Sequence, residues 1–489
     1  MLNENQVIRL ILGFKLRYLR QQKGLSYQEL SAQTGLSTSY LNDIEKGKRY
    51  PKPDKITALA QALGVDYNYM VATNASKKLQ PIIDLIHSNF FKLFPLQEFG
   101  ISLEKLLELF TQTPDKVNAF ISTIFKIARN FQIDETMFYK EALRSYQDMH
   151  NNHFPEIEEA TRKFKSDFSI GESLPFTQSF LEDQLHELYD ITVDDAHLSE
   201  NSNLRHIRSF YNPKKKTLYI QKNLTEAQRN FILAREIGFQ FLDLKERPLA
   251  TTVIRINSFD ELLNNYKASH FSAALLMPEN ELVNDIREMA RANVWDPKSL
   301  PGLMKKYNAT GEMLLQRFTN VLPHHFGLED LFFLRLNGDD SNQRYSMTKD
   351  LHLSQLHSPY NNELEEHYCN RWVSVTSIQE LNWKKKSPMV VDAQISKYWN
   401  TDKEYLCLSI AKPSYKDPRV GVSVTLGLLV TPQLRSIFYF LTDPKLKKRE
   451  VHTTCERCGV QDCKSRVAPS IIIEKREFEA SVIQDLGKL

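Results

Sequence analysis

Three of the five cysteines in this 489-residue chain lie close together, as Cys455, Cys458 and Cys463 in the run VHTTCERCGVQDCKSRVAPS. A C-x2-C pair can bind one metal ion through both thiolates, and the third cysteine supplies a third ligand. Cys369 or His452 could complete a tetrahedral zinc site, and with Cys369 the four thiolates could instead hold an iron-sulfur cluster. Free buried thiols or a redox-sensing cluster are the alternatives that this spacing leaves open.

The middle of the chain alternates strand-like and helical patterns around one carboxylate, Glu236. The run IRSFYNPKKKTLYIQ predicts two strands joined by a turn at Asn212 and Pro213, and NLTEAQRNFILAREIGFQFL from Asn223 predicts a helix. The run HFSAALLMP follows. This order of segments resembles the ImmA/IrrE-type metallopeptidase domain. The resemblance implies an α+β, zincin-like middle domain over residues 169–335.

The chain departs from that family at the residues that would perform the chemistry. In the family, an H-E-x-x-H helix binds zinc through two histidines and uses the glutamate as a general base, and a later carboxylate completes the site. Here Arg235 and Phe239 stand at the histidine positions, and residues 265–267, where the carboxylate is expected, are Asn, Tyr and Lys. A permanent cation and an apolar ring cannot bind zinc. We therefore expect a peptidase fold without activity, with Glu236 beside Arg235 and paired to a cation or to a backbone donor. Histidines elsewhere show no ligand spacing relative to this helix and are expected to be satisfied or exposed: His206, His270, His324 and His325.

Residues 14–71 have the pattern of a compact helical module. Ser26 followed by Glu29 forms a capping box, which predicts a helix start, and Gly35 predicts its end. A third helix is expected to open at Ser37. Apolar residues at helical spacing predict a core closed by five short helices: Leu12, Leu16, Leu19, Leu30, Ala32, Leu36, Leu41, Ile44, Ile56, Leu59, Leu63 and Val65.

About sixty residues, from QQKGLSYQEL through YLNDIEKGKRYP to ALGVD, resemble the Xre-type DNA-binding domains of phage repressors. The resemblance implies an all-α, lambda-repressor-like helix-turn-helix over residues 1–73, whose second motif helix enters the major groove of double-stranded DNA. Arg20 and Glu45 match the family's internal ion pair. Base edges are expected to face Thr38, Ser39 and Tyr40, phosphates are expected to meet Gln28, Lys48 and Arg49, and Asn42 is a further DNA-binding candidate. A solvated surface side chain is the alternative for each.

Charge and composition agree with a DNA-binding protein. Residues 1–75 contain ten Lys and Arg against six Asp and Glu, a net charge of +4, whereas the whole chain carries +3. This basic excess is modest, so we expect salt-sensitive binding by a homodimer that doubles the phosphate contacts. Because the chain lacks an apolar run of about 20 residues and a signal-peptide pattern, we expect a cytoplasmic protein without a membrane partner.

The remaining segments complete a multidomain organisation. Residues 74–168 read as a helical linker or dimerisation region, and residues 336–489 as an α+β C-terminal sensor domain with the cysteine cluster. The cysteine run, the CNRW run at Cys369, the strand-like EYLCLSIAKP and the FPEIEEATRKF helix together resemble the short-chain fatty acyl transcriptional regulators of bacteria.

That resemblance implies a transcription regulator that senses a short-chain acyl-CoA or a related metabolite and controls carbon-metabolism genes. It implies no enzymatic activity. Two alternatives remain: a zinc metallopeptidase that acts on a repressor partner, and a DNA-binding scaffold without a small ligand. Arg235 and Phe239 weigh against the peptidase.

Overall fold

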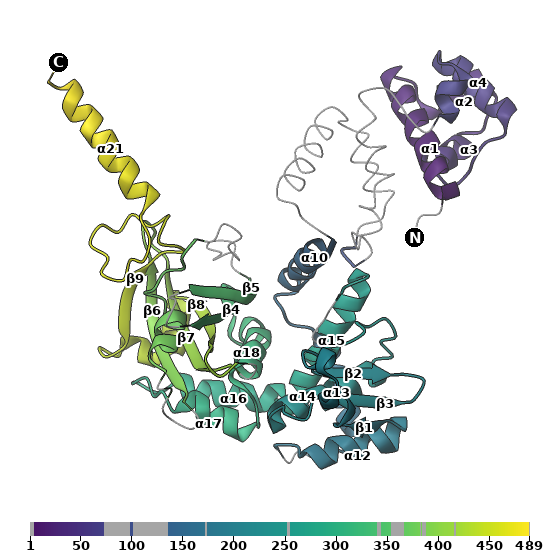
Figure 1. Cartoon of the computed structure of the whole chain (residues 1–489). Coiled ribbons are helices and arrows are strands. Elements are labelled where there is room, and N and C mark those ends of the chain that lie inside the picture. Colours follow the sequence, from purple (N-terminus) through teal and green to yellow (C-terminus); the bar gives the residue numbers. More distant parts are fainter. Residues whose placement is uncertain are drawn as a thin grey trace. The chain divides into compact units, whose positions relative to one another are not determined.

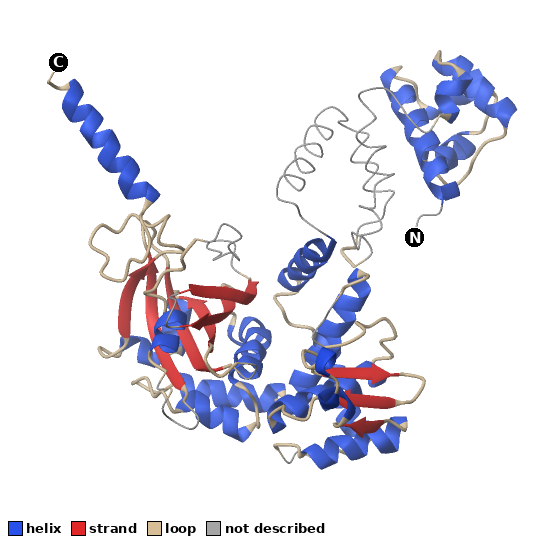
Figure 2. Ribbon diagram, in the orientation of Figure 1, coloured by secondary structure: helices blue, strands red, loops and turns tan. Residues whose placement is uncertain are grey.

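The computed structural model describes residues 4–72, 98–100, 135–171, 174–251, 255–339, 344–353, 366–381, 383, 388–414 and 417–488. The chain divides into two compact units, one of residues 1–146 with 256–262 and one of residues 147–255 with 263–489. Figure 1 labels their elements, and Figure 2 separates helices from strands. In the described part of the chain no helix has the length and apolarity needed to cross a membrane.

The N-terminal module consists of five helices: α1 (Glu4–Gln22), α2 (Tyr27–Thr34), α3 (Thr38–Glu45), α4 (Pro53–Leu63) and α5 (Tyr67–Val71). The predicted capping box is present, because Ser26 and Glu29 each accept a hydrogen bond from the other's backbone. Gly35 ends α2 with a φ of 69°, a left-handed conformation that glycine adopts without strain. Ser37 then caps α3 by accepting a hydrogen bond from the Tyr40 amide.

Most of the predicted core of this module is confirmed. Eleven of the twelve expected residues are buried in the core or packed against it, and Leu36 is among them. Ala32 was wrong, because it lies on the exposed face of α2. The sequence pattern also missed Lys15, which is fully buried and donates hydrogen bonds to the last carbonyls of the module, Tyr69 O and Ala72 O.

The predicted linker is described only in part. Residues 73–97 and 101–134, with the apolar helix faces expected there, lie outside the described residues. The described remainder is helical, as expected, with α10 (Glu135–Met149) and α11 (Pro155–Asp167). The turn between them contains Asn151 and Asn152 in left-handed conformations, with φ of 48° and 54°. Asparagine tolerates this conformation better than most residues.

The middle of the larger unit is helical around a small sheet. Strand β3 (Thr217–Ile220) pairs antiparallel with β2 (Ser209–Asn212), as the hairpin prediction requires, and parallel with β1 (Thr192–Asp194). Helix α14 carries Glu236 and begins after the cap Thr225. The surrounding helices are α12 (Gln178–Tyr189), α13 (His197–Glu200), η1 (Ser202–Leu204), α14 (Glu226–Phe241), α15 (Phe259–Leu276), α16 (Glu279–Ala290), α17 (Ser299–Lys306) and α18 (Gly311–Phe326).

The C-terminal part is built on a six-stranded sheet in the order β5-β4-β8-β7-β6-β9, antiparallel except for the β6 and β9 pair. Its strands are β4 (Leu331–Asp339), β5 (Arg344–His352), β6 (Val390–Tyr398), β7 (Glu404–Pro413), β8 (Gly421–Leu429) and β9 (Lys447–Val451). Its helices are α19 (Val373–Gln379), α20 (Pro432–Ile437), η2 (Tyr439–Thr442) and α21 (Ile471–Leu486). Figure 1 shows α21 extending away from the sheet.

Strand β7 is buried along most of its length because helices cover both faces of the sheet. Alternate residues of a strand point to opposite faces. Cys407 belongs to the core that also contains α19, whereas Ile410 faces Gly311 of α18. The same helix α18 carries Arg317, whose buried guanidinium binds Glu158 of α11 through two hydrogen bonds. Helix α18 therefore joins the middle domain to the C-terminal sheet.

The architecture is multidomain, with a helical N-terminal module, a helical and α+β middle and a sheet-containing C-terminal region. The boundary expected between residues 335 and 336 falls inside strand β4. Composition does not reveal where β4 begins, because its apolar residues FFLRL follow α18 after only a short turn.

Candidate functional site

An ion pair holds the helix that carries the DNA-binding candidates. Arg20 of α1 donates from Nε to Glu45 Oε1 at 2.6 Å and from Nη2 to Glu45 Oε2 at 3.0 Å. The hydroxyl of Tyr27 donates to the same carboxylate at 2.6 Å, and the Arg20 guanidinium also packs on the Tyr27 ring. Both charged partners are buried. The predicted pair is therefore confirmed, and it fixes the end of α3 against α1.

The structure places the predicted base-facing residues on one exposed turn. Thr38, Ser39 and Tyr40 form the first turn of α3, with Thr38 and Ser39 exposed and Tyr40 half-buried. Asn42 is half-buried one turn further along. The predicted phosphate-contacting residues are also exposed: Gln28 on α2, and Lys48 and Arg49 after α3. Their contacts with DNA stay predictions.

Tyr40 has two cations beside its ring, and the sequence pattern identified only one of them. Arg49, a predicted phosphate contact, lies 5.8 Å from the ring centroid and also pairs with Asp43 at 3.2 Å. The amino group of Lys55, in the first turn of α4, lies closer, at 4.5 Å. Lys55 lies fifteen residues after Tyr40 and on a different helix, so only the fold brings the two side chains together. Lys55 thus extends the candidate surface.

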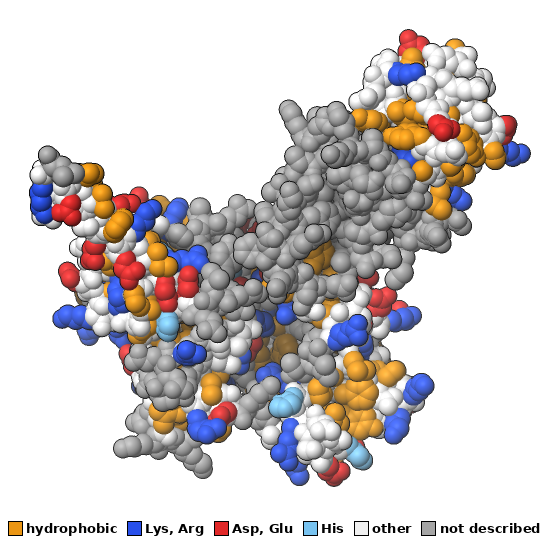
Figure 3. Space-filling view, turned by 45° about the horizontal axis from the view of Figure 1, so that its top comes forward, with side chains coloured by type: hydrophobic (Ala, Val, Ile, Leu, Met, Phe, Trp, Pro, Cys, Tyr) orange, Lys and Arg blue, Asp and Glu red, His pale blue; other side chains and the backbone are white. Residues whose placement is uncertain are grey.

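The surface charge is dispersed. Figure 3 shows Lys and Arg side chains interspersed with Asp and Glu over the described part of the face that it displays. This distribution agrees with the modest net charge of +3. Recognition then depends on the local arrangement of α3 and its neighbours more than on a strong overall field.

The carboxylate of Glu236 is neutralised by an arginine. Arg247 donates from Nη1 to Glu236 Oε1 at 2.8 Å and from Nη2 to Oε2 at 2.6 Å, and Gln240 donates to Oε1 at 2.8 Å. Glu236 is buried, and the Arg247 guanidinium lies 3.9 Å from the centroid of the Phe239 ring. The predicted pairing of Glu236 with a cation is confirmed, although the partner is Arg247 and not the neighbouring Arg235. Arg247 therefore pairs with the carboxylate that would have to be free to act as the general base in a peptidase.

The other replaced positions also have structural partners. Arg235 is buried and donates from Nη2 to Ser209 Oγ at 3.0 Å and to Thr251 Oγ1 at 2.6 Å. Burial, followed by repulsion from Arg247, lowers its pKa to about 10, so it still carries a proton at neutral pH. Tyr266, where the family's acidic ligand was expected, donates to Asn152 Oδ1 at 2.6 Å. These side chains stabilise the fold of the former centre.

Sequence reasoning did not find Arg247. It lies eleven residues after Glu236, beyond the end of α14, and nothing in its spacing marks it as a partner of that helix. The only available signal was indirect, because a buried carboxylate without histidine ligands needs a cation.

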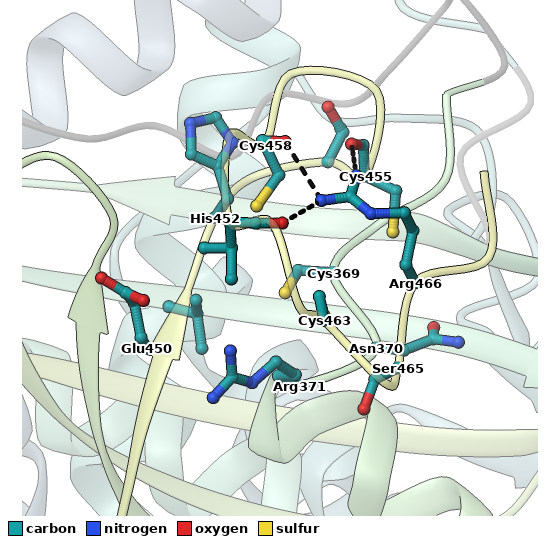
Figure 4. A pocket seen from close by; sticks show the side chains of 13 residues that line it. Cys369, Asn370, Arg371, Glu450, His452, Cys455, Cys458, Cys463, Ser465 and Arg466 are labelled. Carbon is teal, nitrogen blue, oxygen red and sulfur yellow. Dashed lines mark hydrogen bonds between the residues drawn. The ribbon is translucent and has the colours of Figure 1, made fainter. Parts of the chain in front are cut away.

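All four predicted cysteine ligands line one pocket at the end of the six-stranded sheet (Figure 4). The pocket is bounded by Cys369, Asn370, Arg371, Glu450, Val451, His452, Thr454, Cys455, Cys458, Val460, Cys463, Ser465 and Arg466. Backbone hydrogen bonds bring the two cysteine segments together, because Cys369 N donates to Thr453 O and Cys455 N donates to His367 O. The fold thus brings Cys369 to the same pocket as the three cysteines of the C-x2-C-x4-C run.

The sulfur atoms do not form a compact ligand set. Among the described side chains, the one group with three ligand atoms within 4.8 Å of one another consists of histidines, and the four cysteines do not form such a group. Burial raises the pKa of the Cys369 thiol to about 11 and also raises the pKa of Cys455, which favours protonated thiols. The four thiols therefore share a pocket without converging on one point, and the zinc or iron-sulfur site stays a prediction.

Arg466 crosses the cysteine pocket and organises its loop. It donates to Cys455 O at 2.9 Å, to Cys458 O at 3.3 Å and to Val460 O. Figure 4 shows these bonds as dashed lines. Ser470, the N-cap of α21, donates to Cys458 O at 2.7 Å. Backbone carbonyls of the cysteine loop are therefore satisfied by protein donors.

Comparisons with known proteins agree with the two-part organisation. A family model described as helix-turn-helix matches residues 16–70. A second model, described as an IrrE N-terminal-like domain, matches residues 195–319. The first range covers α2 and α3, and the second covers the helix with Glu236.

Three curated relatives match the N-terminal module. An uncharacterised HTH-type transcriptional regulator, y4dJ of Sinorhizobium fredii, is 39% identical over 64 residues, which are 13% of this chain and 83% of that protein. The HTH-type transcriptional repressor RghR of Bacillus subtilis is 41% identical over 56 residues, 11% of this chain and 42% of the relative. Control protein C.BamHI of Bacillus amyloliquefaciens is 39% identical over 59 residues, 12% of this chain and 73% of the relative.

One solved structure is similar over a longer stretch. A transcriptional regulator of Mycobacterium tuberculosis aligns with 68% of this chain and 94% of its own, at a TM-score of 0.48 and 15% sequence identity.

Proposed function

This chain belongs to the helix-turn-helix family of DNA-binding transcription regulators, and from that we propose that it is a metabolite-responsive regulator of the short-chain fatty acyl type. The observation that carries the proposal is the combination of an intact DNA-binding module with a peptidase-like domain whose centre is closed by Arg247. In this proposal the middle and C-terminal domains act as a sensor.

The DNA-binding half rests on the surface around α3. Its first turn presents Thr38 and Ser39 to solvent, while the opposite side is anchored by the Glu45 carboxylate to α1. A recognition helix needs this combination of a rigid inner face and a free outer face. We propose that the chain binds as a homodimer, because a single small module makes few phosphate and base contacts.

The non-catalytic role of the middle domain is supported by the charges at its centre. Two arginines, Arg235 and Arg247, stand beside Glu236, and the IrrE-like match covers all three residues. A divalent zinc ion would have to displace Arg247 and would then find Phe239 where an imidazole is needed. We therefore propose a zincin-like fold that has kept its scaffold without its catalytic site.

The sensor assignment is supported by the shared helix α18. Arg317 on this helix binds Glu158 of α11, and Gly311 on the same helix contacts the central strand β7. A ligand that shifts the C-terminal sheet would act on the same helix that anchors the middle domain. We propose an acyl-CoA or a related carbon-metabolism intermediate as the effector, from the resemblance of the cysteine-bearing end to that of short-chain fatty acyl regulators.

The DNA-binding part can be tested with full-length protein and its own operator, selected from random DNA. Changing Lys48 and Arg49 to Ala should weaken binding to all sequences and reduce the salt dependence. Changing Thr38 or Ser39 to Ala should relax the preference for the operator by about 1 to 3 kcal/mol for each lost base contact. Equal losses on operator and random DNA would remove Thr38 and Ser39 from the base-reading surface.

The sensor part needs a separate measurement. Operator affinity should change when propionyl-CoA or acetyl-CoA is added, but not with free coenzyme A at the same concentration. A peptidase assay with added zinc, comparing the parent with Glu236→Gln, tests the competing function. Cleavage that the substitution abolishes would favour the enzyme, and unchanged operator binding with every acyl-CoA would favour a scaffold.

A further inference from the structure

We propose that the larger unit contains a binding site for one divalent transition-metal ion, of the zinc class, formed by His153, His324, His325 and Glu279. His153 lies in the turn before α11, Glu279 is the first residue of α16, and His324 and His325 are in the last turn of α18. The site goes beyond the proposed function, since it uses neither the peptidase-like helix nor the cysteine pocket. Three imidazoles and a carboxylate are a ligand set suited to zinc.

The ligand atoms already converge. One ring nitrogen from each histidine lies within 4.8 Å of the others. His153 Nε2 and His325 Nε2 are 2.9 Å and 2.7 Å from the same oxygen, Glu279 Oε1. Because a zinc–nitrogen bond is about 2.1 Å, two ligands of one ion lie at most about 4.2 Å apart. Side-chain movements of less than about an ångström would therefore bring the three ring nitrogens onto a common ion, with Glu279 beside two of them.

The rings are packed tightly enough to hold a defined geometry. The His153 and His324 rings stack with centroids 4.1 Å apart and an interplanar angle of 4°. The His325 ring stands at 88° to His324, with centroids 4.8 Å apart. His153 is buried, His325 is half-buried and His324 is exposed, so an ion could enter from the side of His324.

A cation also lies beside the site. Arg162 Nη1 lies 3.6 Å from Glu279 Oε2, on the oxygen that His153 and His325 do not use. The Arg162 side chain is 55% exposed, so it can move into solvent when a cation binds. The C-terminal end of α18 has the opposite effect, because the partial negative charge of a helix C-terminus favours a nearby cation.

Neighbouring residues fix His153 in place. The preceding residue, Asn152, is buried and donates to Thr319 Oγ1 of α18 at 2.8 Å. Tyr266 donates to its side chain at 2.6 Å, and Asn320 donates to its backbone carbonyl at 2.9 Å. A supporting shell of this kind orients a metal ligand before the ion arrives. An ion at this site would therefore link the turn before α11 to α16 and α18.

The site can be tested on metal-free, full-length protein titrated with Co²⁺ and then with Zn²⁺. We expect one equivalent of Co²⁺ to give the visible absorption of a four-coordinate nitrogen and oxygen site, without thiolate-to-cobalt charge transfer. Saturating Zn²⁺ should displace the cobalt and raise the Tm on the order of 5 °C. The variant His324→Asn should weaken Co²⁺ binding at least tenfold.

His324→Asn is the informative variant because His324 is exposed and its loss should leave the fold intact. His197→Asn is the matched control, since His197 is an exposed histidine that pairs with Asp194 away from the site. Equal Tm values of the metal-free parent and His324→Asn would establish that both are folded. Co²⁺ binding that is unchanged by His324→Asn, or that shows only thiolate charge transfer and is lost in Cys455→Ser, would overturn the proposal. Failure to bind any Co²⁺ would also overturn it.

Discussion

Two arginine–glutamate pairs with the same bidentate chemistry serve opposite purposes in this chain. Arg20 and Glu45 join α1 to the end of α3 and leave the outer side of that helix free. Arg247 and Glu236 join a loop to α14 and close the position at which a peptidase would hold its catalytic base. One pair supports the exposed first turn of α3, and the other occupies the buried carboxylate of α14.

The difference shows how the location of an ion pair decides its consequence. A buried pair contributes little net stability over apolar residues of similar shape, but removing one partner is costly. In the N-terminal module this cost maintains the position of α3 against α1. In the middle domain the same cost would oppose any change that reopened the centre to a metal ion.

The largest effect is expected at the N-terminal pair. In Arg20→Ala the buried Glu45 carboxylate loses its cation and keeps the hydrogen bond from the Tyr27 hydroxyl. The change should lower the free energy of unfolding of the module by about 3 to 5 kcal/mol. Replacing Arg20 and Glu45 together with Met and Leu should cost less than the single change. Thermal unfolding of the three proteins, followed together with operator binding, measures both. A single variant that is as stable as the double variant would contradict this expectation.

A somewhat smaller effect is expected at the second pair. The Arg247 side chain is 21% exposed, so water can partly solvate Glu236 when Arg247 is removed. Arg247→Ala should therefore destabilise the larger unit by about 2 to 3 kcal/mol. Arg247→Lys should recover part of this loss, because it restores the charge without the bidentate geometry. If Arg247→Ala destabilised the protein as much as Arg20→Ala or more, the greater exposure of Arg247 would not explain how the two pairs differ in their contribution to stability.

A third test uses pH and a third buried pair. Burial raises the pKa of Glu158, but Arg317 and His270 outweigh this effect and hold the pKa well below its usual range. A carboxyl with a lower pKa in the folded state stabilises the fold above its unfolded value, near 4.3, and loses that contribution as pH falls further. The larger unit should thus lose on the order of 2 kcal/mol below about pH 4. Glu158→Gln should flatten this pH dependence, and a profile unchanged by that substitution would exclude Glu158 as its source.

A fourth test asks whether the cysteines of the pocket are core residues or metal ligands. Cys455 and Cys458 are both buried, so changing the two to Ser places hydroxyls in a poorly solvated pocket and should cost about 1 to 2 kcal/mol. If a metal binds there, the loss should be larger and should be accompanied by loss of the effector response. Elemental analysis of the parent, beside thermal unfolding of the variant, separates these outcomes. A parent without zinc or iron and an equally stable variant would leave the cysteines as ordinary core residues.

The features that the sequence predicted correctly are those encoded by residues close together along the chain. The capping box of α2, the turn at Gly35 and the hairpin at Asn212 depend on residues within four positions of one another, and all are present. The Arg20–Glu45 pair was predicted because a resemblance supplied its partner.

Features assembled from distant segments were not predicted. Arg247 meets Glu236 through an irregular loop, and His153 meets His325 across 172 positions, so no periodicity links either pair. His324 and His325 were expected to be ordinary satisfied or exposed histidines, although their adjacency at the end of one helix was a visible signal. Packing decides such contacts, and packing is not encoded in local spacing.

The smallest expected effect concerns the cation that the sequence pattern missed at the DNA-binding surface. In the middle domain, Arg247 lies over the Phe239 ring at 3.9 Å, and in the N-terminal module Lys55 lies over the Tyr40 ring at 4.5 Å. The first contact is fixed by a buried carboxylate, whereas Lys55 is half-buried beside an open surface. Cation–π contacts at exposed sites contribute about 0.5 to 1 kcal/mol.

Lys55→Ala should therefore weaken operator binding by about 0.5 to 1 kcal/mol, because Tyr40 loses a neighbour that holds its ring on the reading face. Lys52→Ala is the control, since Lys52 is an exposed lysine three residues earlier that makes no side-chain cap on α4. If Lys55 instead contacts a phosphate, its loss should weaken operator and random DNA equally and reduce the salt slope by about one. A change confined to the operator would assign Lys55 to positioning Tyr40, and identical effects of the two lysine variants would remove it from the surface.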